Sequence, residues 1–179
     1  MKRLVFLILI VSVTHVFGQS KDSLNFYLSK ANEFQLKGNY EKSLTMCNLA
    51  LRIDSNNCKA YKMKGINLSS LNRTDEERAL YQKAIKKSCN VVLNNLNLKS
   101  LYFNEGNNSE ALNYLNKVII LKPDSGALYY ERWSIKTIMK DSIGGMADLQ
   151  KAKNLGFPSA IVMEKQLNQK DEVEQDDKD

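Results

Sequence analysis

The chain repeats itself every 34 residues. When the segment from Leu24 to Asn57 is moved along the sequence by 34, 68 and 102 residues, chemically similar side chains fall on the same positions. One aromatic column contains Tyr27, Tyr61 and Tyr129, and one column of small residues contains Ala50, Ala84 and Ala152. Recurring residues of this kind at helical spacing indicate the buried contacts of helix pairs. The sequence therefore predicts an all-α repeat array.

The same register predicts the turns and the core. Gly38 and Asn39 in the first repeat correspond to Gly106 and Asn107 in the third, where a helix must end in a left-handed conformation. The inward columns predict these core side chains: Tyr27, Phe34, Tyr61, Tyr81, Tyr102 and Leu115. We expect helices over residues 24–37, 40–54, 58–71, 74–88, 92–104, 108–121, 126–139 and 142–155.

This pattern resembles the tetratricopeptide repeat family, whose unit is a helix-turn-helix of 34 residues. The residues that carry the resemblance are Tyr27, Ala31, Phe34, Gly38, Tyr40 and Ala50 in the first unit, and Gly106, Ala111 and Pro123 in the third. The resemblance implies a right-handed α-solenoid of four units, at residues 24–57, 58–91, 92–125 and 126–157. The fourth unit is degenerate.

Five residues depart from the family pattern. Lys99 and Trp133 stand where Ala31 and Gly65 are small. Glu77 and Gly145 share a column with Ser43 and Ala111, and Lys136 replaces an apolar residue. We therefore expect the second and fourth units to pack more loosely, or to be shifted by a residue or two.

The first eighteen residues read as a secretory signal peptide. Lys2 and Arg3 precede an apolar run from Leu4 to Val13, and cleavage is expected after Gly18. The run is shorter than the roughly 20 residues that a membrane-spanning helix needs. We expect an exported protein, periplasmic or secreted, without stable membrane insertion after cleavage; an uncleaved anchor is the alternative.

The two ends of the mature chain differ from the repeats. Residues 19–23 form a short lead, and residues 158–168 have helical spacing suited to a helix that caps the open end of the array. Residues 168–179 contain six acidic residues and two lysines, without apolar periodicity. We expect a disordered acidic tail over residues 169–179.

The sequence offers little for catalysis. Its one histidine, His15, lies in the predicted signal peptide, so the mature chain has no imidazole for acid-base or metal chemistry. The three cysteines do not have the close spacing of a zinc site, and no glycine-rich phosphate loop is present. We predict a non-catalytic protein with no cofactor and no metal.

The cysteines have another interpretation in an oxidising compartment. Cys58 opens the second repeat and Cys89 closes it, and a helix hairpin brings its two ends to one edge. A disulfide between them and two free thiols are both compatible with the sequence. Cys47 falls on an inward column and is expected to be buried.

The family resemblance also implies a binding surface. In such proteins the first helix of each unit lines the concave side. The matching residues here, which we expect to form a peptide-binding groove, are Asn32, Lys59, Lys62, Ile66, Leu96, Phe103 and Tyr130. Lysines beside apolar side chains suit a protein or peptide partner that carries acidic residues.

Several functions fit such a surface. The favoured one is an adaptor that binds a peptide segment of an envelope or secreted bacterial partner. A scaffold that self-associates through its open repeat faces and a periplasmic holdase chaperone are the alternatives, and an enzyme or small-ligand carrier has less support. Residues 19–167 have a net charge of +8 spread over all four units, but export argues against nucleic acid as the partner.

Overall fold

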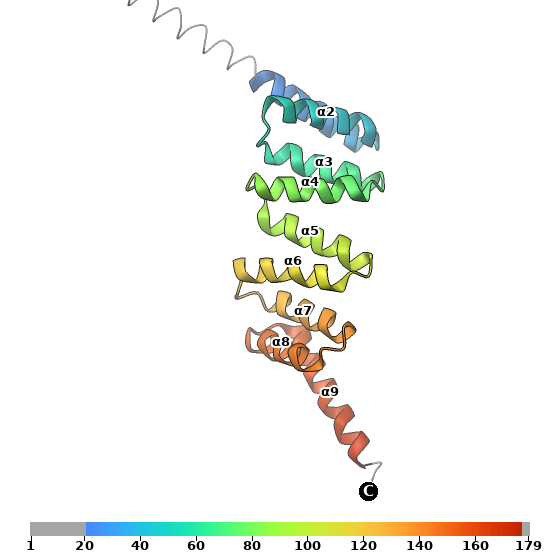
Figure 1. The fold of residues 1–179 in the computed structure, drawn as a ribbon, viewed down its shortest axis with the longest axis vertical. Helices are drawn as coiled ribbons and strands as arrows, with labels where there is room; N and C mark the ends of the chain where they lie inside the picture. The colour runs from blue at the N-terminus through green and yellow to red at the C-terminus, as the bar shows by residue number, and fades with distance from the viewer. Residues whose placement is uncertain (1–20, 177–179) are drawn as a thin grey trace, which may run out of the picture. The chain divides into compact units, whose positions relative to one another are not determined.

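The structure, a computed structural model, describes residues 21–176, and every regular element within that range is a helix. The predicted signal peptide, residues 1–18, lies outside the described residues, as do residues 177–179. A first helix covers residues 21–36. It is followed by α2 (Tyr40–Ile53), α3 (Cys58–Ser70), α4 (Thr74–Lys86), α5 (Val91–Asn104), α6 (Asn108–Leu121), α7 (Gly126–Ile138), α8 (Ser142–Asn154) and α9 (Pro158–Asp176) (Figure 1). The predicted all-α solenoid fold is confirmed.

The last helix differs from its prediction. We expected a cap that stops at residue 168 and a disordered tail from residue 169, but α9 continues to Asp176. Residues 168–176 contain no glycine or proline, and most of them are good helix formers such as Gln, Lys and Glu. Apolar periodicity ends before this stretch, whereas helical propensity does not.

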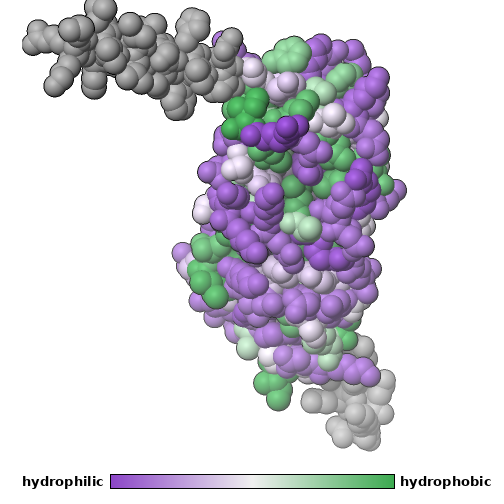
Figure 2. Space-filling model, turned by 45° about the horizontal axis from the view of Figure 1, so that its top comes forward, coloured by the Kyte–Doolittle hydropathy of each residue, from purple (hydrophilic) through white to green (hydrophobic). Residues whose placement is uncertain are grey.

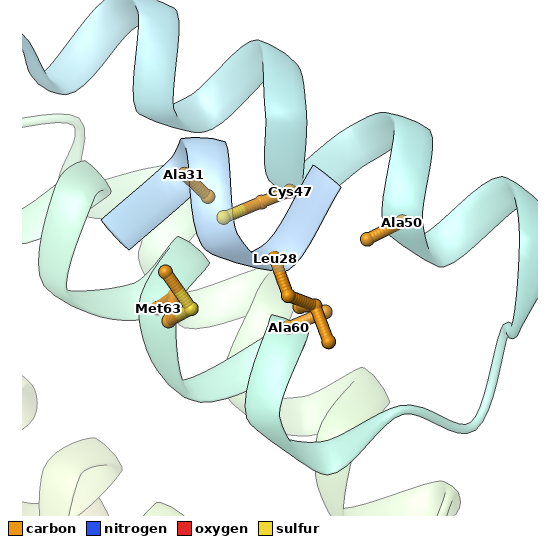
Figure 3. Close-up of a cluster of buried hydrophobic side chains, with 6 residues drawn as sticks. All are labelled: Leu28, Ala31, Cys47, Ala50, Ala60 and Met63. Carbon is orange, nitrogen blue, oxygen red and sulfur yellow. The ribbon is translucent and has the colours of Figure 1, made fainter. Parts of the chain in front are cut away.

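The helices form two compact units. The first unit includes the described residues up to Asn94, and the second unit begins at Asn95, so α5 contributes one turn to the first unit and the remainder to the second. In the first unit one apolar cluster joins three consecutive helices (Figure 3). Its buried members are Leu28, Ala31, Cys47, Ala50, Ala60 and Met63. A second cluster continues through α3 and α4 to Cys89.

The second unit has two clusters of its own. The first joins α6 and α7 around Ala111, Leu115 and Ile135. The other joins α8 and α9 around Leu149, Ala152 and Ala160, with partly buried aromatic residues from α7 packed against it. Residue 160 is thus part of the core, and α9 covers the end of the array as the sequence predicts.

One turn position has a left-handed backbone in every hairpin. Gly38 and Gly106 have φ angles of 70° and 76°, and Asn72 and Lys140 occupy the equivalent positions with 55° and 62°. Glycine adopts this conformation without strain and asparagine tolerates it. In a lysine the Cβ comes too close to the following carbonyl oxygen, so the conformation is strained. Glycine or asparagine therefore accounts for three of these four turns, and Lys140 is the strained exception.

The packing of the second repeat explains its unusual residues. A Cβ on Gly65 would lie 2.9 Å from Cε1 of Tyr81, so the glycine makes room for a buried tyrosine ring. The Tyr81 hydroxyl donates a hydrogen bond of 2.6 Å to Oε1 of Glu77, which gives this buried carboxylate a partner. The glycine, the tyrosine and the glutamate therefore fit one another.

In the fourth repeat the large residue is on the first helix of the hairpin and the glycine is on the second. Trp133 is large where Gly65 is small, and the facing residue is Gly145, whose Cβ would meet Trp133 Cδ1 at 3.5 Å. Helices α4 and α8 nevertheless begin at Thr74 and Ser142, as predicted. Compensation between facing positions therefore keeps both repeats in register, without the shift that we expected.

The predicted core residues are buried to different degrees. Tyr61, Tyr81 and Leu115 are buried, whereas Tyr27, Phe34 and Tyr102 are half-buried. The ring of Tyr102 stacks on Tyr114 at a centroid distance of 5.5 Å. The inward columns thus include positions at the edges of the hairpins, where one side of the ring remains exposed.

Candidate functional site

The clearest candidate surface is a stripe on α3. Lys59, Lys62 and Ile66 are all exposed, and Ile66 keeps 44% of its area in solvent. Spacings of three and four residues align them along one side of the helix. Most of the rest of the helix is buried, at Ala60, Tyr61, Met63, Gly65, Asn67 and Leu68. Lys64 is partly exposed, and Ser69 and Ser70 at the end of the helix are exposed. This stripe is therefore the side of α3 that a ligand can reach.

The two lysines of the stripe carry unneutralised charge. Within residues 21–176 neither Lys59 nor Lys62 forms an ion pair, whereas other cations of the first unit do. Arg73, for example, contacts both Glu41 and Glu76. A carboxylate of a ligand could approach the stripe without displacing an existing partner.

Asn32 is exposed on the first helix, but its neighbourhood is mixed. Leu28, one turn earlier, belongs to the apolar cluster and is only 6% exposed. Glu33 accepts hydrogen bonds from Lys30 and Lys37 at 2.7 and 2.8 Å. Those bonds and the two positive charges lower the pKa of Glu33 to about 2. The first helix thus contributes a polar amide beside a charged network that is already satisfied.

The other predicted site residues lie in the second unit. Phe103 is exposed at the end of α5, whereas Leu96 is half-buried against the α6–α7 cluster. Tyr130 packs against Trp133 and Phe157, with ring centroids at 4.9 and 5.3 Å. The structure therefore brings Lys59, Lys62 and Ile66 together. Leu96 and Tyr130 have much of their surface buried against core residues.

The structure joins Cys58 and Cys89 in a disulfide with a Cα separation of 5.1 Å. The bond connects the first residue of α3 to the segment that follows α4. Cys47 is the free cysteine and is buried. Burial raises the pKa of its thiol to about 11, so the thiol remains protonated and unreactive at neutral pH.

Sequence reasoning missed an ionic cluster in the second unit. Asp148 is 4% exposed, and its carboxylate accepts hydrogen bonds from Arg132 Nε at 2.8 Å and lies 2.8 Å from Lys136 Nζ. Burial by itself raises the pKa of Asp148, but the contacts from Arg132 and Lys136 outweigh it and the pKa is lowered. Lys136 in place of an apolar residue was the available signal, because a lysine on an inward column needs an anion nearby.

Other ligand types find little support. Residues 21–176 contain no group of three or more potential metal ligands. None of the described helices combines the length and the apolarity that crossing a bilayer requires. On the face seen in Figure 2, apolar side chains form small separate patches within a mainly polar surface. A ligand there would have to use polar and apolar contacts together.

Comparisons with known proteins agree with the fold. Residues 24–57 match the family model described as tetratricopeptide repeat. The fold is similar to that of MamA from Desulfovibrio magneticus RS-1, with a TM-score of 0.62 and 19% identity over 75% of this chain and 76% of that one. A second MamA crystal structure is similar with a TM-score of 0.64 and 16% sequence identity, over 78% of each chain.

A mutant O-GlcNAc transferase from Thermobaculum terrenum is also similar, with a TM-score of 0.51 and 19% identity over 65% of this chain and 22% of that one. No curated protein sequence matches the chain. At these identities the structural matches establish the fold and leave the partner open.

Proposed function

Since this chain is a tetratricopeptide repeat protein, by sequence at residues 24–57 and by fold along its helical array, we propose that it is a non-catalytic adaptor that binds a peptide segment of another protein. The observation that carries the proposal is the exposed stripe of Lys59, Lys62 and Ile66 on a helix whose other positions are mostly buried. Hairpin packing accounts for the buried faces of α3 and leaves this stripe without a structural task.

The chemistry of the stripe defines the ligand. Lys59 and Lys62 lie one turn apart and suit one or two carboxylates, and Ile66 follows one turn later as an apolar contact. Asn32, on the first helix, offers an amide that can bond to a peptide backbone. The proposed ligand is therefore a segment with an acidic residue followed or preceded, at a short distance, by an apolar side chain.

A peptide selection tests this proposal. The purified protein would be panned against a displayed random peptide library, and the affinity of the selected peptides measured by fluorescence anisotropy. We expect acidic and apolar residues to be enriched together. A stripe variant, Lys62→Glu with Ile66→Ala, should weaken binding at least about tenfold, because it removes a central apolar contact and reverses a charge.

The matched control changes the same residue types away from the stripe. Lys42→Glu with Ile53→Ala alters two exposed residues of α2 and has the same net charge as the stripe variant. It should bind as the wild type does. Equal loss in both variants, or selected peptides without acidic residues, would contradict the proposal.

We also propose that the protein is exported after removal of residues 1–18. The basic pair Lys2 and Arg3 before the apolar run supports this, and so does the Cys58–Cys89 disulfide, because such bonds persist in oxidising compartments. The intact mass of protein purified from its own cells should correspond to a chain that begins at Gln19. A chain that retains Met1 and stays with the membrane fraction would contradict export.

A further inference from the structure

Net charge differs between the first unit, the second unit and the carboxyl-terminal end of the chain. Residues 21–94 contain 13 lysines and arginines against 7 acidic residues, a net charge of +6. Residues 95–167 contain 9 against 7, a net of +2, and residues 168–179 contain 2 against 6, a net of −4. The first unit is thus strongly basic, and the end of the chain is acidic.

Part of the excess in the first unit is concentrated at one edge. The disulfide holds the Cα atoms of Cys58 and Cys89 5.1 Å apart, so the start of α3 and the end of α4 meet there. Lys59 follows Cys58, and Lys86 and Lys87 precede Cys89 by three and two residues. Since each residue adds at most about 3.8 Å, the Cα atoms of Lys86 and Lys87 lie within about 20 Å of that of Lys59. We call Lys59, Lys86 and Lys87 the basic edge.

The basic edge is held in place but not neutralised. The backbone at Cys89 donates to Ala84 O at 2.9 Å, and the Asn94 side chain donates to Cys89 O at 2.6 Å. All three lysines are exposed, and within residues 21–176 none has a carboxylate partner. Three like charges on a fixed edge favour a ligand with several negative charges.

The acidic end of the chain is presented outward from its own unit. Met163 and Leu167 of α9 pack against the second unit's core, and Lys153 pairs with Glu164 at 2.6 Å to fasten the helix. From Leu167 the helix continues for nine residues to Asp176, about 13 Å at 1.5 Å per residue. This extension leaves the body of its unit (Figure 1).

We propose that the basic edge of one copy binds the acidic carboxyl-terminal segment, residues 169–179, of a second copy. The contact joins different surfaces of the two molecules, so it is heterologous and can continue from copy to copy. It goes beyond the peptide-binding proposal. Lys59 belongs to both surfaces, whereas Lys86 and Lys87, which the variants below change, are outside the α3 stripe.

The test is the molar mass in solution, measured by light scattering over a range of protein concentrations. In about 0.1 M salt, where the Debye length is roughly 10 Å, we expect the mass to rise above that of one chain as the concentration increases. In about 1 M salt, where it is roughly 3 Å, the mass should return to that of one chain. A single-chain mass at all concentrations in low salt would overturn the proposal.

Charge reversal identifies the two surfaces. An edge variant, Lys86→Glu with Lys87→Glu, and a tail variant, Asp171→Lys with Glu172→Lys, should each weaken self-association on the order of tenfold. An equimolar mixture of the two should regain association, because the unchanged edge of the tail variant can then bind the unchanged tail of the edge variant. A mixture that remains dissociated would show that the tail is not the occupant.

A control variant separates a specific contact from general charge. Lys122→Glu with Lys151→Glu changes two exposed lysines of the second unit by the same total charge, and we expect wild-type association. Equal weakening by the edge and control variants would overturn the proposal. Peptide affinity of the edge variant reports separately on the α3 stripe, so failure of one proposal can be told from failure of the other.

Discussion

The fit between Gly65 and Tyr81 can be tested by adding one methyl group. Gly65→Ala places a Cβ 2.9 Å from Tyr81 Cε1, and the ring cannot move freely because its hydroxyl is bonded to the buried Glu77. Overpacking of this kind costs about 1 to 3 kcal/mol, while alanine in a helix contributes about 0.8 to 1 kcal/mol relative to glycine. The net expectation is a change in unfolding free energy from roughly zero to 2 kcal/mol of destabilisation.

Gly145 provides the comparison. A Cβ there would meet Trp133 at 3.5 Å, an ordinary contact, so Gly145→Ala should keep the helix gain and stabilise the second unit by roughly 0.5 to 1 kcal/mol. The two alanine substitutions are chemically identical and differ in their neighbours. Urea unfolding, with hydrogen exchange to resolve each unit, should therefore give values that differ by about 1 to 3 kcal/mol.

A double-mutant cycle tests whether the Tyr81 ring causes the effect of Gly65→Ala. In a Tyr81→Leu background the ring is gone, and leucine already occupies the equivalent position as Leu115 and Leu149. Gly65→Ala should then be stabilising instead of destabilising. If Gly65→Ala is equally destabilising with and without the Tyr81 ring, then the proposed size compensation is wrong.

Three further predictions concern the ionic cluster, the strained turn and the disulfide. Asp148→Ala should destabilise the second unit by about 1 to 3 kcal/mol, since it leaves the half-buried Arg132 and Lys136 without their anion. Because the pKa of Asp148 is lowered in the fold, its contribution should be complete above the ordinary pKa of about 3.9 and be lost as pH falls through the folded value. Lys140→Gly should stabilise by roughly 0.5 to 1 kcal/mol, because it relieves a left-handed lysine at φ 62°. Cys58→Ser should lower the unfolding free energy by about 2 to 4 kcal/mol, and the unreduced, unfolded wild type should expose one thiol, that of Cys47.

Each of these has an outcome that would contradict it. The exposed Asp124 serves as the control for Asp148, and equal losses at both positions would mean that the cluster has no special role. Urea midpoints unaffected by Lys140→Gly would mean that this turn stores no strain. Three reactive thiols in the unreduced protein would exclude the Cys58–Cys89 bond.

The fold was predictable because its signals are periodic and local. Columns such as Tyr27, Tyr61 and Tyr129 report helix-helix contacts, and Gly38 and Gly106 report the turns that separate helices. These patterns place the helices to within a few residues. The family resemblance then supplies the stacking that no single repeat contains.

The exceptions were less predictable because they involve pairs of residues. Glu77 and Trp133 depart from the family pattern when each is considered alone. Their neighbours in space explain them: Tyr81 donates a hydrogen bond to Glu77, and Gly145 leaves room for Trp133. The ionic cluster at Asp148 has the same character, since its partners lie sixteen and twelve positions earlier in the sequence. A single sequence shows each residue but not its partner.

The candidate site was predictable in part. Exposure of Lys59, Lys62 and Ile66 follows from helical spacing once the buried face of α3 is known. Leu96 and Tyr130 occupy the same column as Lys62, yet they are half-buried because they pack against apolar and aromatic neighbours. Column position therefore predicts which way a residue faces more reliably than how much of it a ligand can reach.

The most direct test of the central claim is to map where a selected peptide binds. Backbone amide NMR spectra of the protein, recorded during titration with that peptide, report the contact region without any mutation. We expect saturable shifts at Lys59, Lys62 and Ile66 on α3, and at Asn32. Shifts confined to α2, α4 or the second unit, with α3 unchanged, would contradict it.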